Sequence, residues 1–155
     1  MKRIVAWALV GWISITNASG GKPHCTLRAY VEANVHDGEV FATQLRSQTT
    51  GKKIVIEKVP TISERDVIAF YPYQAGDGSY GVLFQLNDHG RLALDTLSIE
   101  KRGTFLYVFV NGRPAAELQI DRRVSDGKLY LSSGLTQADL VLMRKDWPLI
   151  GQRKK

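Results

Sequence analysis

Cysteine is nearly missing from this chain, which has one, Cys25, among 155 residues. A single cysteine excludes an internal disulfide framework. Histidine is also scarce: His24, His36 and His89 are the only three, and none takes part in a His-x-x-x-His or paired-cysteine spacing. These spacings are what metal-site motifs require, so we expect neither a metal nor another cofactor.

The chain also lacks an apolar run long enough to cross a bilayer, which takes about 20 residues. Its longest run, Ile4–Ile15, follows a basic start at Met1–Arg3 and precedes small residues at Thr16–Gly20. That order is typical of a secretory signal peptide. We therefore predict a signal peptide at residues 1–20 and export to the periplasm or cell envelope. Retention of the segment as a membrane anchor is the alternative.

No strong excess of charge marks the remainder. The formal net charge is +6, of which Lys2 and Arg3 belong to the predicted signal, and much of the rest lies in a basic tail at residues 148–155. An exported protein rarely meets nucleic acid, so we expect no nucleic-acid partner. With 44% hydrophobic and 23% charged residues, the composition is that of an ordinary globular domain.

Alternation of apolar and polar residues dominates residues 21–65. It predicts strands at Leu27–Val35, Val40–Arg46 and Ile54–Val59, with a turn at His36–Gly38. Pro60 ends the third strand. We interpret this part as an antiparallel meander of three strands.

Residues 66–147 mix strands with two helices. Asn87 or Asp88 and Thr136 are the expected helix caps, and Asn111-Gly112 is a strong hairpin signal. The predicted elements are strands at Val67–Gln74, Tyr80–Leu86, Phe105–Val110, Ala115–Ile120 and Leu129–Leu131, and helices at Asp88–Arg102 and Gln137–Lys145. We predict an α+β fold, with both helices on one face of an antiparallel sheet. The first helix would bury Leu92, Leu94, Leu97 and Ile99.

The passage from Tyr80–Leu86 into Asp88–Arg91, the apolar strand ending at Asn111-Gly112, and Ser133–Thr136 before the last helix resemble a known family. They are similar to the head subdomain of the first periplasmic domain of the SecD/SecDF protein-translocation factor, over about residues 67–143. The resemblance implies a ferredoxin-like character and a non-catalytic role in handling polypeptide outside the membrane. Transmembrane helices after the N-terminus are missing, so the family's motor function does not carry over.

Aromatic residues flank one predicted hairpin. Strand alternation places Tyr71 and Tyr73 on one face, and Tyr80 lies across the loop. Such residues serve cross-strand stabilisation or an exposed strip that binds polypeptide. The short strand containing Leu129 and Leu131 is expected at a sheet edge, where a peptide could add as a further strand. These five residues are the candidate binding site for polypeptide or another envelope protein.

Two alternatives remain open. One is a small secreted hydrolase that uses Cys25 or a His/Asp pair such as His36-Asp37 or Asp88-His89. The other is a structural envelope protein held at the membrane by an uncleaved N-terminus.

Overall fold

The computed structural model describes residues 21–34, 36 and 38–153, so the predicted signal peptide lies outside the described residues. The described chain has the predicted α+β fold, and its strands pair antiparallel within each sheet. They form a four-stranded sheet in the order β4-β1-β7-β8, a three-stranded sheet in the order β5-β6-β9, and a β2–β3 hairpin. None of the described helices has both the length and the hydropathy needed to cross a membrane.

The elements follow in this order: β1 (Leu27–Val31), α1 (Gly38–Phe41), β2 (Ala42–Arg46), β3 (Lys53–Glu57), β4 (Ile62–Ser63), a 3-10 turn (Glu64–Asp66), β5 (Val67–Gln74), β6 (Tyr80–Leu86), α2 (Asp88–Glu100), β7 (Phe105–Val110), β8 (Arg113–Gln119), β9 (Lys128–Leu135) and α3 (Gln137–Asp146). From β5 onward these bounds differ from the predicted ones by a few residues at most, except that β9 is longer.

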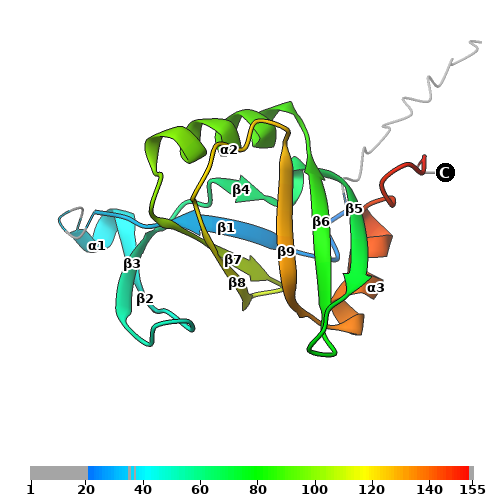
Figure 1. Ribbon diagram of the computed structural model, residues 1–155, viewed down its shortest axis with the longest axis horizontal. Helices are drawn as coiled ribbons and strands as arrows, with labels where there is room; N and C mark the ends of the chain where they lie inside the picture. Colours follow the sequence, from blue (N-terminus) through cyan, green and yellow to red (C-terminus); the bar gives the residue numbers. More distant parts are fainter. Residues whose placement is uncertain (1–20, 35, 37, 154–155) are drawn as a thin grey trace, which may run out of the picture.

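One hydrophobic core lies between the two larger sheets. In Figure 1, β9 and β6 cross in front of β1, while α2 and α3 lie at different ends of the sandwich. Phe84 and Phe70 from one sheet meet Trp147 after α3 in edge-on contacts, with centroids 5.9 and 6.4 Å apart. Leu106 and Val108 of β7 belong to the same core. The two helices therefore do not share one face of one sheet, which corrects that part of the prediction.

Local signals explain the boundaries that were predicted well. The Asn87 side chain accepts a hydrogen bond from the Gly90 N–H at 2.9 Å and begins α2. Asn111 and Gly112 adopt positive φ values of 51° and 76°, as the tight turn between β7 and β8 requires. Thr136 and Asp139 cap α3 reciprocally.

The predicted three-strand meander is wrong. β1 pairs with β7 and β4 instead of β2, for example through Ala29 opposite Val108 and Ile62. Only β2 and β3 pair with each other, and the start of the predicted second strand is the short helix α1. Alternation shows that a segment is a strand but carries no information about its partner.

The prediction of which α2 residues are buried was also wrong in part. Leu94 and Leu97 are buried, as expected, whereas Leu92 and Ile99 are 61% and 56% exposed. At about 100° per residue, positions 92 and 99 lie on the side of the helix away from the core. Apolar content alone therefore overestimates the buried face.

Candidate functional site

The three-stranded sheet has one covered edge and one open edge. Along β5, the Phe70 N–H donates to the Pro148 carbonyl at 3.1 Å, and the Ile150 N–H donates to the Phe70 carbonyl at 2.9 Å. Residues 148–150 of the predicted basic tail thus extend the sheet beyond β5. At the other side the sheet ends at β9, so the structure places the predicted strand of Leu129 and Leu131 at an edge.

The register of β9 decides what this edge offers. Leu129 and Leu131 are 3% and 0% exposed, so their side chains face the core. The Leu86 N–H donates to the Gly127 carbonyl, and the alternation of an antiparallel ladder then turns the backbone groups of Tyr130 away from β6. The Lys128 N–H, on the same outer side, is bound by the Asp126 carboxylate at 3.1 Å.

A groove of 740 Å³ lies between the β9 edge and the edge strand β8 of the other sheet. The two strands approach each other at one end, where a side chain at Gly134 would meet the Ala115 carbonyl at 2.5 Å. Away from that contact, the walls are residues 117–119 of β8 with the following Ile120, and residues 128–130 of β9. Apolar side chains line the groove between these walls, and we call them its floor: Leu94, Leu97, Leu106, Leu118, Ile120 and Leu129. Leu83 also lines the groove, but it is opposite Tyr71 and Tyr130 in the sheet and shares their outer face.

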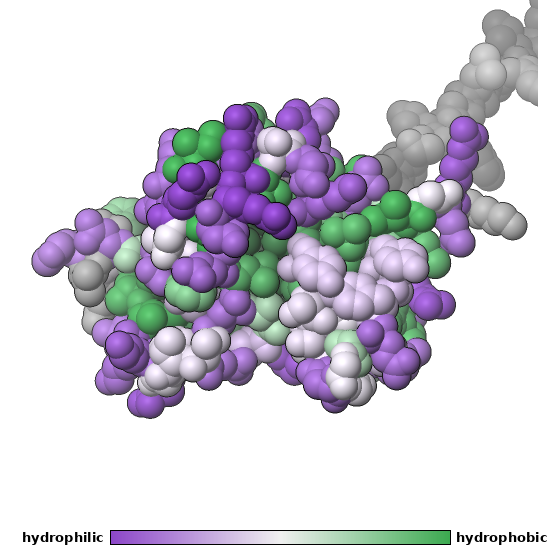
Figure 2. Space-filling model, in the orientation of Figure 1, coloured by the Kyte–Doolittle hydropathy of each residue, from purple (hydrophilic) through white to green (hydrophobic). Residues whose placement is uncertain are grey.

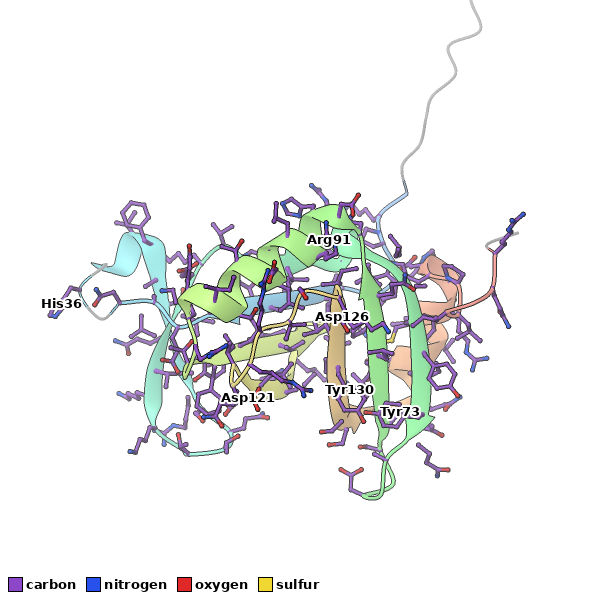
Figure 3. All side chains as sticks on the ribbon, turned by 45° about the horizontal axis from the view of Figure 1, so that its top comes forward. His36, Tyr73, Arg91, Asp121, Asp126 and Tyr130 are labelled. Carbon is purple, nitrogen blue, oxygen red and sulfur yellow. The ribbon has the colours of Figure 1, made fainter. Side chains whose placement is uncertain are left out.

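The loop from β8 to β9 forms the rim of this groove. The Arg123 guanidinium donates two hydrogen bonds to Asp95 of α2, at 2.6 and 2.9 Å, and holds the pKa of that carboxyl below its ordinary value. The Val124 N–H donates to Ser98 Oγ at 2.9 Å. Asp121 and Asp126 mark the two ends of the loop in Figure 3, between α2 and the β9 edge. Rim charges of both signs surround an apolar floor.

Tyrosines cover the outer face of the same sheet beside the groove. We define the tyrosine strip as Tyr71, Tyr73 and Tyr130. Tyr73 and Tyr130 are stacked, with centroids 5.5 Å apart and planes 10° from parallel (Figure 3). Tyr71 and Tyr130 are 55% and 54% exposed, and Figure 2 shows pale aromatic side chains gathered over β5, β6 and β9. The strip and the β9 edge therefore form one continuous surface.

A glycine positions the strip. Tyr73 is opposite Gly81 in the sheet, and a side chain at Gly81 would lie 2.2 Å from the Tyr73 ring. The ring therefore lies over the glycine, and the Tyr73 hydroxyl donates to the Leu131 carbonyl at 2.6 Å. Burial, and then the neighbouring Tyr130, raise the pKa of Tyr73 above its ordinary value.

The structure shows which of the predicted residues share this surface. Tyr71 and Tyr73 share the outer face, as alternation predicted. Tyr80 does not join them, because it packs against the hydrophobic core on the opposite face. Tyr130 was missed, although its position between the apolar Leu129 and Leu131 was the signal that it points outward.

Cys25 is poorly suited to nucleophilic chemistry. It is fully buried, and burial, followed by the charges of Asp139 and Asp146, raises its pKa to about 12. The neighbouring His24 directs Nδ1 to Asp146 at 2.8 Å, and the Cys25 N–H donates to the same carboxylate at 2.7 Å. A reactive thiolate needs a depressed pKa, so this environment opposes a hydrolase based on Cys25.

The other histidines lie apart from the groove and the strip. His36 is exposed at the far end of the molecule in Figure 3, and its sequence neighbour Asp37 lies outside the described residues. His89 contacts the buried Asp66 at 2.7 Å instead of pairing with the predicted Asp88. Across residues 21–34, 36 and 38–153, no cluster of three His, Cys, Asp or Glu side chains could hold a metal ion.

Comparison with known proteins gives a fold likeness. Neither a protein-family model nor a curated protein sequence matches this chain. Among solved structures, a membrane component SecDF that enhances protein export matches with a TM-score of 0.54 at 12% identity, over 79% of this chain and 63% of that one. SecDF in a super-membrane-facing form matches with a TM-score of 0.54 at 13% identity, over 81% of this chain and 19% of that one.

The predicted resemblance to SecDF is thus confirmed at the level of fold, and it extends beyond residues 67–143. The present chain spans less than two thirds of the length of either SecDF structure. At such low identities the likeness concerns the fold alone.

Proposed function

Starting from this SecDF-like fold, we propose that the chain is an exported, non-catalytic module of the cell envelope that binds extended polypeptide. The ligand adds as a further strand along β9, with its side chains alternating between the groove and the tyrosine strip. Backbone hydrogen bonds provide most of the affinity in this binding mode, and pockets for alternate side chains provide the specificity.

The observation that carries the proposal is the open β9 edge beside a groove with an apolar floor. An unpaired strand edge presents N–H and C=O groups that a second chain satisfies. At β9 these groups belong to Tyr130, whose backbone faces the groove. The opposite wall is also an edge strand, β8, so both walls offer backbone groups to an extended ligand.

The two faces of such a ligand would meet different surroundings. Side chains that point inward reach the leucines of the groove floor, and those that point outward reach Tyr130 and Tyr73. Tyrosine gives a large contact area at low entropic cost and accepts varied partners. An acceptor of unfolded polypeptide needs this tolerance.

Two further observations support a place in the envelope. The order of residues 1–20 is that of an export signal. One of the structurally similar proteins is described as enhancing protein export. Polypeptide that emerges from a membrane is extended and exposes apolar side chains, which fits the proposed ligand.

A binding experiment on the full chain tests this function. We expect a reduced, carboxymethylated and therefore permanently unfolded protein to bind, as measured by fluorescence anisotropy. Tyr130→Pro removes the backbone N–H that faces the groove and should weaken binding by about tenfold or more. Tyr130→Ala is the matched control, because it keeps the N–H and removes only the ring, and it should weaken binding less. Equal weakening by both variants would contradict strand addition.

Hydrogen exchange gives a second readout that needs no substitution. On binding, the Tyr130 amide should become protected, whereas the Leu129 amide, already directed at β6, should change little. If the unfolded protein does not bind, the proposed function is wrong. If it binds without protecting Tyr130, the ligand occupies another surface.

A further inference from the structure

We propose that the cavity between the β2–β3 hairpin and the outer face of the four-stranded sheet is a second ligand site, for a small carboxylate that carries a ring. This site is separate from the groove at β9. In Figure 1 the hairpin projects at the opposite side of the molecule from β5 and β6.

The cavity has the size of a small-molecule site. Its volume is 480 Å³, within the range of about 300–1,000 Å³ typical of such sites. One wall is the outer face of β1 with the end of β7, and the other is the inner side of the hairpin.

The hairpin is attached at both ends and leaves the cavity between the attachments. Near β1, the Ala33 N–H donates to the Val55 carbonyl at 2.9 Å, and Glu32 forms a bridge with Ile56. At the tip, the Glu117 carboxylate of β8 accepts hydrogen bonds from the Ser47 hydroxyl at 2.8 Å and from the Gln48 N–H at 2.6 Å. An isolated two-stranded hairpin is marginally stable, so these attachments determine its position.

Aromatic and aliphatic side chains face each other across the cavity. Tyr30 and Phe109 meet edge to face on the sheet side, with centroids 5.6 Å apart and an interplanar angle of 86°. Leu45 and Ile56 line the hairpin side. A flat ring between these layers would contact apolar atoms on both sides, an arrangement that favours aromatic and cyclic ligands.

Positive charge without a partner selects an anion. Arg28 lies opposite Phe109 in the sheet, and Lys58 comes from the hairpin. Within the described residues, neither side chain forms an ion pair or a side-chain hydrogen bond, and Glu57 is the sole acidic residue of the lining. A guanidinium binds a carboxylate through two parallel hydrogen bonds, and a planar ring suits the adjacent aromatic floor.

Paired probes test the charge requirement. Phenylacetate and phenylacetamide have the same ring and nearly the same shape, and only the first carries a carboxylate. In an NMR titration of the full chain, phenylacetate should shift the ring signals of Tyr30 and Phe109 and bind about tenfold more tightly than phenylacetamide.

Matched arginine variants locate the effect. Arg28→Gln should abolish the preference for phenylacetate, whereas Arg144→Gln, which alters an exposed arginine on α3, should leave it unchanged. Equal affinity of the two probes would overturn the proposal. So would a preference that survives Arg28→Gln, or the absence of any shift at Tyr30 and Phe109.

Discussion

Gly81→Ala should remove Tyr73 from its place in the tyrosine strip. The added methyl would lie 2.2 Å from the Tyr73 ring, so the ring must move away from the sheet. Its movement breaks the 2.6 Å hydrogen bond to the Leu131 carbonyl and separates the ring from Tyr130. The substitution therefore tests how the candidate surface is assembled.

The expected loss of stability follows from these two contacts. A hydrogen bond contributes about 0.5–1.5 kcal/mol net, and an aromatic pair contributes about 0.5–1.5 kcal/mol beyond its buried area. Replacing glycine in a strand returns about 0.5–1 kcal/mol, because glycine loses the most conformational freedom on folding. We expect Gly81→Ala to lower the free energy of unfolding by about 1–2 kcal/mol, measured by urea denaturation.

Gly76→Ala provides the matched control in the adjacent loop. A side chain at Gly76 would meet no described atom within 4 Å, so stability should change by less than about 0.5 kcal/mol. The ring-current shift of the Tyr130 signals should disappear in Gly81→Ala alone. If Gly81→Ala changed neither the stability nor the Tyr130 signals, the conclusion that the Tyr73 ring lies over Gly81 would be wrong.

Two further predictions concern titratable groups. The Cys25 thiol, buried and with its pKa raised to about 12, should resist Ellman's reagent in the native protein and react rapidly after denaturation; rapid native labelling would contradict its burial. Burial alone would raise the pKa of Glu117, but hydrogen bonds from Thr49, Ser47 and Gln48 outweigh it and hold that pKa below the unfolded value of 4.5. The stability that the ionised Glu117 carboxylate adds to the folded state is therefore complete above the unfolded pKa and is lost as the pH falls through the lower folded pKa. Glu117→Gln should thus reduce the acid dependence of amide exchange at the hairpin tip, whereas Glu57→Gln should not. An unchanged pH profile in Glu117→Gln would contradict the attachment of the hairpin tip through Glu117.

Interactions between residues close in sequence made the helices and strands of the second half of the chain predictable. The Asn87 cap, the Asn111-Gly112 turn and the Thr136 capping box are interactions within a few residues, so sequence patterns predict them directly. β5, β6 and β7 have the predicted bounds for the same reason. The α+β class followed from the order of these elements.

The pairing of strands that are distant in sequence could not be predicted from sequence patterns. β1 joins β7 across about 75 positions of sequence, and residues 148–150 extend β5, whereas their sequence predicts a basic tail. Each partner is chosen by the shape and burial of the whole core. The alternation of apolar and polar residues along one strand does not identify the strand with which it pairs.

The candidate site shows the same division. The sequence by itself determined that Tyr71 and Tyr73 share a face and that a strand runs through Leu129 and Leu131, because side-chain direction in a strand alternates with period two. The position of that strand at a sheet edge depends on the pairing of the whole sheet. Only the tertiary structure brought Tyr130 against Tyr73, turned Tyr80 into the core, and opened a groove between β8 and β9. These features depend on the register between strands and on the packing of two sheets, which are set by the long-range burial of the core.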